Sequence, residues 1–460
     1  MRKRPLLLAV LTVVALGIAW ATGLRRSPEK GPASSAAIRC PGCNLLLVSI
    51  DTLRADRLGC YGYARPTSPN LDALAARSIV FRDVLAQSPT TAPSHRTIFS
   101  GRYVFEHRND LSSVPVMAEL LAREGYRTAG FIDGGQLRPQ FGLQRGFETW
   151  FDARRGVRGL TGPGGLEVLN PELIAWLERH RAGPFFAFLQ TYDVHCPYAP
   201  PEPYASLFTD GLETQLEDPG RCGKHLRDEP DLELGPADLA YIGALYDGGV
   251  RYVDAKLAQV IEALARLGLD RNTVLIVTSD HGESLGERAW LGHNHVYDVQ
   301  LKVPLIVYVP GGPQAVVDAP AQSLDLLPTV LALLGIEGPA LPGLDLLALA
   351  FASSDPPPRV RLAESTSLRR RSVRIDDRWS LVLDEGAAVE LYDLAADPAE
   401  ESNLIGSQPQ VARSLLAASR QLGSGSGALP EFPDDLDDEM REQLRALGYA
   451  TDEPHRADAP

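Results

Sequence analysis

The sequence predicts an α/β fold, in which a large, mixed and mostly parallel sheet is sandwiched by helices and followed by a small C-terminal α+β subdomain. Over most of the chain, continuous apolar runs that can form buried strands alternate with amphipathic helical segments. This order is typical of a parallel sheet that is covered on both faces. After Pro358, apolar and polar residues alternate instead, which favours antiparallel strands. The 460 residues are enough for one large core and a smaller domain.

The N-terminus is typical of an export signal. Met1–Arg4 is basic, residues 5–20 are apolar, and Ala19-Trp-Ala21 offers a small-x-small cleavage site. The apolar run is also long enough for a marginal membrane anchor. We therefore expect a signal peptide or N-terminal membrane anchor over 1–23 and a linker over 24–43. The protein is then exported to a periplasmic or other extracytoplasmic compartment, where the segment could also tether it to the membrane.

The five cysteines fit an exported protein. Cys40 and Cys43 form a C-x-x-C pair just before the first strand, and no second pair follows that would complete a zinc site. After export we expect them to form a disulfide or to remain two thiols. Cys196 and Cys222 could also pair. Cys60 is interpreted as a small, buried apolar residue.

The first half of the chain alternates strands and helices. Asn44–Ile50 is an unbroken apolar run that ends at Asp51, as expected of a buried parallel strand. Gly101 and Gly125 are placed to end two helices, because glycine readily adopts the left-handed conformation found there. We expect strands over 44–50, 79–81 and 126–132, and helices over 69–77, 93–100 and 114–124.

The second half continues this order. Its strongest helix runs over 236–267, where apolar residues keep helical spacing until Gly268. The Pro- and Gly-rich segment 196–236 is a long surface insertion, and we expect it to shape a substrate pocket together with residues 156–165. Further predicted elements are a helix over 171–181, buried strands over 184–190, 273–278 and 303–309, antiparallel strands over 370–375, 379–383 and 389–394, and helices near 410–422 and 437–447. The domain boundaries are 44–355 for a catalytic domain, 356–450 for the C-terminal subdomain and 451–460 for a disordered tail.

Three of the buried strands lead into acidic or histidine-bearing loops. Asp51 follows the first, Asp193 and His195 follow another, and Asp280 with His281 follows a third. Each residue alone could be a solvated loop side chain, but the carboxyl ends of parallel strands meet at one edge of a sheet. Oxygen ligands with an imidazole suit one divalent metal ion: Ca²⁺, Mg²⁺, Mn²⁺ or Zn²⁺.

The net charge constrains the partners. It is −14, which argues against nucleic acid as a partner and against attachment to anionic lipid by charge. An acidic protein that acts on an anionic substrate needs a local positive source, such as a metal ion or a helix N-terminus. Ser88–Gly101 offers the second, because it places the hydroxyl of Thr91 where a helix begins. The alternative is a Ser/Thr-rich turn that only caps the helix.

Taken together, the spaced motifs resemble the sulfatase family of the alkaline-phosphatase-like superfamily. The likeness runs from about Asn44 to Tyr449, with the motifs in the family's order. They are Asn44–Asp51 with Thr52–Gly62, Thr91-Ala-Pro-Ser-His95 with Ser100-Gly101, Ser279-Asp-His-Gly-Glu283, Lys302-Val-Pro-Leu305, and Glu390–Leu394 with Asp397, Glu400 and Asn403-Leu404.

The resemblance implies roles for individual residues. Asp51, Asp280 and His281 would be metal ligands. Thr91 stands at the nucleophile position and would also bind the metal. His195 would contact the anionic ester or protonate the leaving group. Two further histidines, His293 and His295, stand near the family's substrate-binding Lys or His, and spacing leaves both open.

The departures from the family bear on the chemistry. Family members place Cys or Ser at the nucleophile position, followed by a recognition arginine, and this residue is converted to formylglycine. Here Thr91 and His95 stand at these positions, and Thr52 replaces the second Asp of the family's Asp pair. Threonine cannot give that aldehyde, so an alkoxide attack on a phosphoester is favoured.

These observations predict an exported, metal-dependent hydrolase of anionic esters, either sulfate or phosphate and phosphonate, on a small-molecule, glycan or lipid substrate. Thr91 favours phosphoester over formylglycine chemistry. One alternative is a transferase that moves a phosphoryl head group onto an envelope glycan or lipid. Another is an inactive family member that only binds anionic glycans.

Overall fold

The fold is taken from a computed structural model, which describes residues 38–108, 110–156, 164–221, 234–352, 359–375 and 378–422. The described residues all belong to one compact unit. Within the described ranges, no helix has both the length and the apolar character needed to cross a membrane. The export segment expected over 1–23, the helix expected over 437–447 and the tail over 451–460 lie outside the described residues.

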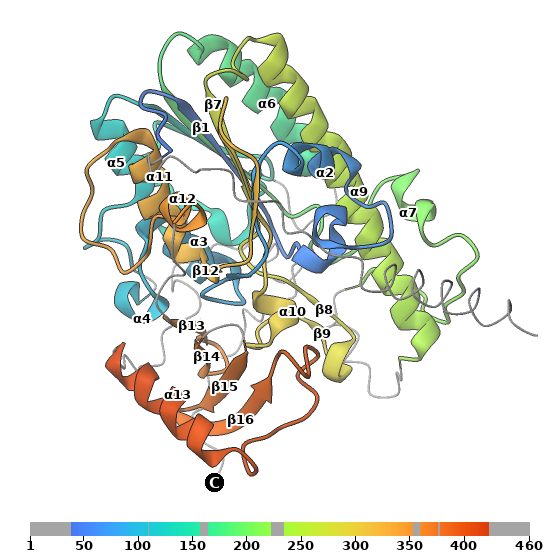
Figure 1. The fold of residues 1–460 in the computed structure, drawn as a ribbon. Coiled ribbons are helices and arrows are strands. Elements are labelled where there is room, and N and C mark those ends of the chain that lie inside the picture. The colour runs from blue at the N-terminus through green and yellow to red at the C-terminus, as the bar shows by residue number, and fades with distance from the viewer. Residues whose placement is uncertain are drawn as a thin grey trace, which may run out of the picture. The chain divides into compact units, whose positions relative to one another are not determined.

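The centre of the fold is an eight-stranded mixed sheet with the strand order β11-β2-β10-β7-β1-β6-β4-β5. Figure 1 shows two neighbouring strands of this sheet, β1 and β7, side by side. Neighbouring strands are parallel except at β10, which is antiparallel to both β7 and β2. The expected mixed, mostly parallel sheet is therefore confirmed. The strands are β1 (Asn44–Ile50), β2 (Ile79–Phe81), β4 (Arg127–Ile132), β5 (Thr149–Asp152), β6 (Phe185–Thr191), β7 (Thr273–Thr278), β10 (Leu305–Tyr308) and β11 (Ala315–Val317).

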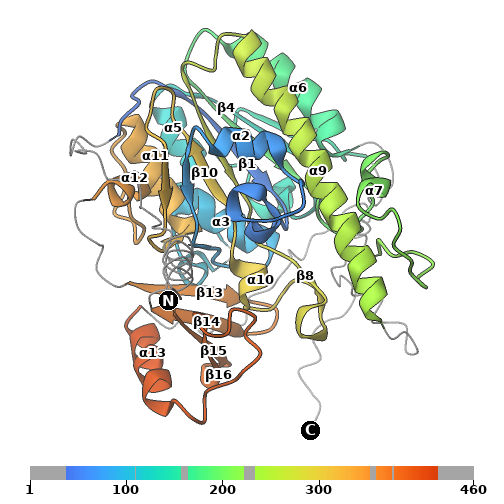
Figure 2. The same cartoon turned by 45° about the vertical axis from the view of Figure 1, so that its right-hand side comes forward.

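Helices cover both faces of this sheet, because every side chain of β1 is buried and successive side chains point to opposite faces. Leu45 and Leu47 pack into one core with α3 (Thr91–Ser100), α5 (Met117–Arg123), α11 (Leu326–Leu334) and α12 (Leu346–Ala350). Leu46 and Val48 pack into a second core with α2 (Pro69–Ala75), α6 (Gly165–His180) and α9 (Pro236–Arg266). Figure 2 shows α6 and α9 lying side by side.

The C-terminal subdomain is a four-stranded antiparallel sheet with α13 (Pro409–Gln421) packed on it. Its strands are β13 (Val360–Ser365), β14 (Arg370–Ile375), β15 (Trp379–Asp384) and β16 (Ala387–Asp393). The small α+β subdomain expected after Pro358 is confirmed. The sequence analysis did not include β13, which pairs with β14 along its whole length.

Three predicted helices differ from the structure at their ends. Helix α5 begins at Met117 rather than at 114, and α3 begins two residues before the expected 93. Helix α6 begins at Gly165 and continues through Pro171, which the sequence analysis took as its start. The insertion 196–236 contains the short helix α7 (Tyr204–Leu207), while residues 222–233 are outside the described ranges.

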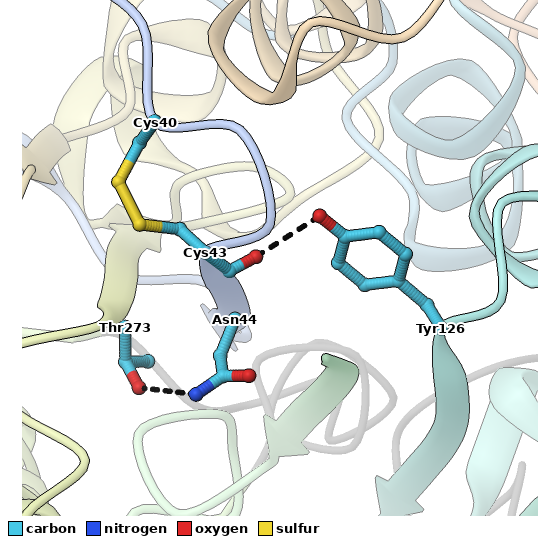
Figure 3. Close-up of a disulfide and its surroundings, with 5 residues drawn as sticks. All are labelled: Cys40, Cys43, Asn44, Tyr126 and Thr273. Atoms are coloured by element: carbon cyan, nitrogen blue, oxygen red, sulfur yellow. Dashed lines mark hydrogen bonds between the residues drawn. A yellow bond between two sulfur atoms is a disulfide. The ribbon is translucent and has the colours of Figure 1, made fainter. Parts of the chain in front are cut away.

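A disulfide between Cys40 and Cys43 immediately precedes β1 (Figure 3). The hydroxyl of Tyr126 donates a hydrogen bond to the carbonyl oxygen of Cys43 at 3.1 Å, and the Asn44 amide donates to Thr273 Oγ1 at 3.3 Å. These contacts fix the start of β1 against the segments that begin β4 and β7. Of the two states that the sequence left open for this pair, the structure has the disulfide.

Cys60 is a free thiol that is partly buried rather than buried as expected. It lies on a short 3₁₀ turn, Gly59–Tyr61, at the margin of the second core. The suggested pairing of Cys196 with Cys222 involves Cys222, which is outside the described residues.

Candidate active site

Two strand ends bring three metal-ligand side chains together. Asp51 directly follows β1, while Asp280 and His281 follow β7, its parallel neighbour. Each residue offers one ligand atom, and these atoms all lie within 4.8 Å of one another. All three side chains are fully buried. The edge at which the sequence predicted a metal site therefore does hold these three residues as a cluster, which is called the aspartate cluster below.

The hydroxyl of Thr91 lies against this cluster. It is the first residue of α3, and its Oγ1 lies 3.2 Å from Oδ2 of Asp51 and 3.5 Å from Nε2 of His281. The extended residue Thr90 precedes the helix, and its hydroxyl lies 2.9 Å from Oγ of Ser88. Because Thr90 occupies the N-cap position, helix capping does not account for the position of Thr91.

Thr52 does not replace the missing aspartate as a ligand. Its Oγ1 donates to the carbonyl oxygen of Asp51 at 2.7 Å, and its backbone N–H donates to Oδ1 of Asp280 at 3.3 Å. Its φ is 56°, in the left-handed region that a β-branched residue rarely adopts. The strained backbone thus contributes an amide that orients Asp280, while the hydroxyl points to the main chain.

His95 is a residue of α3 and stands at the position where the family has its recognition arginine. One ring nitrogen, Nδ1, lies 2.8 Å from the carbonyl oxygen of Thr91, and the other, Nε2, lies 3.0 Å from Oγ of Ser49. Burial is the main cause that lowers the pKa of His95. The neutral ring therefore joins the first turn of α3 to β1 and helps to fix the position of the Thr91 backbone.

The aspartate cluster carries negative charge that needs a partner. Burial, and next the nearby Asp280, raise the pKa of Asp51 well above its usual value. Burial opposes ionisation of Asp280 as well, but His281 and His95 bring its pKa below the usual value. Oδ1 of Asp51 and Oδ2 of Asp280 are buried and have no hydrogen-bond partner. Unsatisfied buried carboxylate oxygens are costly, and a divalent cation would satisfy both.

The orientation of His281 agrees with a metal ligand. Its Nδ1 lies 2.9 Å from the carbonyl oxygen of Gly282, so Nδ1 carries the proton and Nε2 presents its lone pair to the cluster. The donor set of two carboxylates, one imidazole and one hydroxyl therefore fits a divalent ion. Bound there, such an ion would supply positive charge and lower the pKa of a neighbouring hydroxyl.

A second buried group lies next to the first. His195 follows β6, Glu283 follows His281 by two residues, and His293 follows the short strand β9 (Leu291–Gly292). Their ligand atoms also lie within 4.8 Å of one another, and Nδ1 of His293 is 3.2 Å from Oε1 of Glu283. The rings of His281 and His293 are 4.6 Å apart between centroids. His195, Glu283 and His293 are called the histidine cluster below.

Burial is the main influence on the pKa values in the histidine cluster. It lowers the pKa of His195 to about 4 and that of His293 to about 4, so both rings are neutral near pH 7. It raises the pKa of Glu283 to about 7. The cluster is therefore suited to contact an anionic group through neutral imidazoles rather than through a stored positive charge.

The structure separates the two histidines that spacing left open. His293 joins the histidine cluster, whereas the ring of His295 packs at 4.3 Å against Trp290 and at 5.7 Å against Tyr297. Asp193, expected at the same edge of the sheet, accepts hydrogen bonds from Leu166 N and Thr191 Oγ1 instead. It thereby caps the first turn of α6 and is not part of either cluster.

The C-terminal subdomain holds the loop that carries His293. This loop runs into α10 (Asp298–Leu301), and Arg374 of β14 forms an ion pair with Asp298. The backbone N–H of Asp298 donates to Oε2 of Glu400 at 2.7 Å, and Tyr297 donates to Glu390 of β16 at 3.0 Å. The subdomain therefore contributes to the site by positioning one wall of it.

The fold and the aspartate cluster agree with the result of comparing this sequence with known protein families. The family model described as Sulfatase matches residues 43–336. The chain belongs to the sulfatase family. The family consists of metal-dependent ester hydrolases, so the expected enzyme class and the family resemblance are confirmed at this level.

Two solved structures and one curated relative illustrate the family likeness. The sulfatase YidJ of Escherichia coli strain K12 is 29% identical over 425 residues, which cover 79% of this chain and 83% of YidJ. The phosphonate monoester hydrolase of Agrobacterium radiobacter superposes with a TM-score of 0.68 at 23% identity, covering 82% of this chain and 96% of that one. BT4656, solved with its substrate D-glucosamine-2-N,6-O-disulfate, gives 0.69 at 19% identity, covering 84% and 98%. These structures bear out the predicted fold.

The sequence analysis missed several residues of this sulfatase-family site. Glu283 stands in the quoted motif Ser279–Glu283 but was given no role, although it is two residues from His281. Gln190 at the end of β6 donates to Oδ2 of Asp51 at 3.4 Å, and Gln136 accepts the Ala92 N–H at 2.9 Å. The position of Gln190 at a buried strand end was a usable signal. For Gln136, which lies on the short 3₁₀ helix Gly135–Leu137, the sequence carried none.

Proposed function

We propose that the protein is an exported, metal-dependent hydrolase of anionic phosphate or phosphonate esters, with Thr91 as the nucleophile. The observation that carries this proposal is the position of Thr91 Oγ1, 3.2 Å from Oδ2 of Asp51 and 3.5 Å from Nε2 of His281. A hydroxyl that only stabilised the helix would not need to contact Asp51 and His281. Asp51 accepts its hydrogen bond and is oriented to draw off its proton.

The identity of the residue at position 91 favours phosphoryl chemistry. The formylglycine route needs a Cys or Ser, whereas threonine keeps its hydroxyl and can attack directly. His95 replaces the arginine that the modifying enzyme would recognise, and its ring is occupied by Thr91 O and Ser49 Oγ. A sulfate ester would be cleaved more slowly, although its tetrahedral shape resembles that of a phosphate ester.

The reaction follows from the residues around Thr91. Asp51, Asp280, His281 and Thr91 would hold the divalent ion, whose charge makes ionisation of the Thr91 hydroxyl accessible near neutral pH. Oγ1 of Thr91 then forms a bond to phosphorus while the bond from phosphorus to the leaving alcohol breaks. His195 and His293, on the adjacent wall, contact the ester oxygens, and the leaving alkoxide takes its proton from water. Water afterwards cleaves the phosphothreonine and releases the product.

Relatives support an anionic ester as the substrate. One structural neighbour is named as a phosphonate monoester hydrolase, and another was solved with a sulfated glucosamine. A phosphonate monoester and this disulfated glucosamine each carry a tetrahedral anionic group, attached through an ester oxygen or, in the N-sulfate, through nitrogen. We extend this class to the present chain, with a small molecule or a glycan as the carrier of the anionic group.

Export is part of the proposal. It rests on basic Met1–Arg4 followed by the apolar residues 5–20. The Cys40–Cys43 disulfide adds support, because structural disulfides persist mainly in oxidising compartments outside the cytosol.

A substrate panel tests the proposal. Turnover of 4-nitrophenyl phosphate, a phosphodiester, a phosphonate monoester and 4-nitrophenyl sulfate would be measured with the metal-loaded protein. We expect the phosphorus esters to be cleaved faster than the sulfate by at least about tenfold in kcat/KM. A preference for sulfate would contradict phosphoryl chemistry. Product analysis with an added acceptor alcohol identifies a transferase, and no turnover with tight binding of a sulfated glycan identifies an inactive binding protein.

A further inference from the structure

We propose that Glu400, in the turn that follows β16, is a positioning residue for the active site, because it holds the beginning of α10 and thereby fixes His293. Glu400 belongs to the C-terminal subdomain and acts through Asp298, which lies five positions after His293. The inference rests on the proposed function for its kinetic test alone, since the hold on the loop is also measured without substrate.

Glu400 contacts the main chain of α10 at the first residue of this helix. Its Oε2 accepts the backbone N–H of Asp298 at 2.7 Å. Arg374 of β14 forms an ion pair with the carboxylate of Asp298, so Asp298 is held by its main chain and by its side chain. Glu400 is 1% exposed and Arg374 is 2% exposed, so water competes little for these contacts. Buried contacts of this kind restrict a loop more strongly than surface ion pairs do.

The backbone of Glu400 adopts a conformation that needs an explanation. Its φ is 54°, in the left-handed region that residues other than glycine rarely occupy. The carboxylate of Asp397 accepts the backbone N–H of Glu401 at 3.1 Å and that of Ser402 at 2.7 Å, which fixes the turn. Such a conformation costs free energy and persists where the surrounding structure requires it. In this turn it directs the Glu400 carboxylate at α10.

The other end of α10 is fixed by a different contact. The backbone N–H of Gly282 donates to the carbonyl oxygen of Gln300 at 2.9 Å. A Cβ atom at Gly282 would lie 2.2 Å from the carbonyl oxygen of Val299, so the helix lies directly against this segment. Loss of the Glu400 contact would therefore release the beginning of α10 and the residues before it, including His293, more than the end of the helix.

The surroundings of Glu400 make glutamine a close replacement for it. Burial, and next Asp298, raise the pKa of Glu400 to about 7, although Arg374 opposes this shift. Near neutral pH, much of Glu400 is therefore the uncharged acid, which can still accept the Asp298 N–H. The amide oxygen of glutamine can accept the same hydrogen bond, whereas alanine cannot.

The alternative is that Glu400 only stabilises the attachment of the subdomain to the rest of the chain. Glu364 of β13 provides a matched comparison, because it makes the same kind of contact elsewhere. Its Oε2 accepts the backbone N–H of Phe105 at 3.0 Å, and its Oε1 accepts a hydrogen bond from Arg371 at 2.6 Å. Glu364 is also buried. A purely structural role predicts similar effects from both glutamates, whereas positioning predicts an effect at His293 from Glu400 alone.

The first test is hydrogen exchange of backbone amides in the metal-loaded, full-length protein, measured by mass spectrometry. In Glu400→Ala, the amides of 293–298 should exchange at least about tenfold faster than in the wild type, because the contact that holds them is lost. Glu400→Gln should restore slow exchange, and Glu364→Ala should leave the exchange of 293–298 unchanged. Equal exchange of these amides in the wild type and Glu400→Ala would overturn the proposal.

The second test compares kcat/KM in two backgrounds. Glu400→Ala should lower kcat/KM by about 30-fold in the otherwise wild-type chain, but by less than about threefold in a His293→Gln background, because it acts through His293. Glu400→Gln should recover most of the loss. Glu364→Ala should lower kcat/KM by less than about threefold in either background. Equal losses from Glu400→Ala in both backgrounds would overturn the positioning role.

Circular dichroism of each variant establishes that it is folded. If Glu400→Ala does not fold, Glu400→Asp takes its place, because a side chain shorter by one methylene does not reach the Asp298 N–H. A wild-type protein that cleaves no ester of the panel would refute the proposed function alone, because the exchange of 293–298 still decides whether Glu400 holds the loop.

Discussion

Thr91 and Asp51 are 40 positions apart in the sequence, yet Oγ1 of Thr91 donates a hydrogen bond to Oδ2 of Asp51 at 3.2 Å. The contact joins the start of α3 to the carboxyl end of β1. It also makes Thr91 the hydroxyl nearest to the carboxylates that would bind a metal ion. The first prediction follows from this contact.

Thr91→Ala should abolish turnover, by at least about a thousandfold, because the attacking oxygen is lost. Thr91→Ser should retain phosphoester turnover, since it keeps the hydroxyl. Thr90→Ala is the matched control: its hydroxyl lies at the same helix end but contacts Ser88. It should change the stability by about 1 kcal/mol and leave kcat within a few fold. Activity of Thr91→Ala within a few fold of wild type would exclude Thr91 as the nucleophile.

A further substitution at position 91 distinguishes direct attack by a hydroxyl from the formylglycine route. Thr91→Cys, expressed together with a formylglycine-generating enzyme, should gain no aldehyde, because His95 stands at the position of the recognition arginine. Mass spectrometry of the tryptic peptide gives the answer. Detection of the aldehyde, accompanied by sulfatase activity, would show that the motif is still recognised.

The second prediction concerns the metal. Asp280→Ala should lose one equivalent of bound divalent ion together with turnover, while keeping its circular dichroism spectrum. The physical reason is that Asp280 offers one of two buried carboxylate oxygens without a hydrogen-bond partner. Asp193→Asn is the control, because Asp193 follows the neighbouring strand but caps α6. An unchanged metal content in Asp280→Ala would refute the ligand assignment.

The third prediction distinguishes His293 from His295. His293→Ala should lower kcat/KM by roughly 100-fold or more, since its ring belongs to the wall that contacts the ester. His295→Ala should change kcat/KM by less than about fivefold and cost about 1–2 kcal/mol of stability through lost packing on Trp290. Steady-state kinetics and urea unfolding measure both effects. The reverse ranking would place His295 at the substrate.

The fourth prediction concerns stability in acid. His107 on α4 (Val104–His107) is 3% exposed, and burial, followed by Arg96, lowers its pKa to about 3. A folded-state pKa below the unfolded value means that protons bind preferentially to the unfolded chain. Above about pH 6.5, His107 is neutral in both the folded and the unfolded state and does not affect the pH dependence of stability. Below that pH, preferential protonation of the unfolded chain lowers the free energy of unfolding by up to about 1.4 kcal/mol per pH unit.

His107→Gln should therefore reduce the slope of the unfolding free energy between pH 6.5 and 5, measured by urea denaturation. Identical slopes in the wild type and His107→Gln would contradict the assignment of this proton-linked term to His107.

The fifth prediction concerns location. The full-length chain with a C-terminal tag should be recovered outside the cytosol, either cleaved near Ala21 or attached to the membrane by its N-terminal segment. Fractionation and N-terminal sequencing test this expectation. Recovery of the intact chain in the cytosolic fraction, with Cys40 and Cys43 reduced, would contradict export.

Much of the fold could be predicted because the signals are local. A short, largely apolar run such as Asn44–Ile50 favours a strand buried on both faces, and helical spacing over 236–267 predicts one long amphipathic helix. Helix ends were less predictable: α6 begins at Gly165 because the carboxylates of Asp133 and Asp193 accept its first backbone N–H groups. Those partners are far away in the sequence, so no local pattern could reveal them.

The sequence by itself determined that Asp51, Asp280 and His281 meet, because residues at the ends of neighbouring parallel strands share one sheet edge. Only the tertiary structure decided between His293 and His295. Both stand in one loop with the same spacing signal, and the direction of each ring depends on the packing of Trp290, Tyr297 and the C-terminal strands around that loop. The tertiary structure also gave Glu283 its partners, since a side chain's contacts across a fold depend on segments that no local pattern specifies.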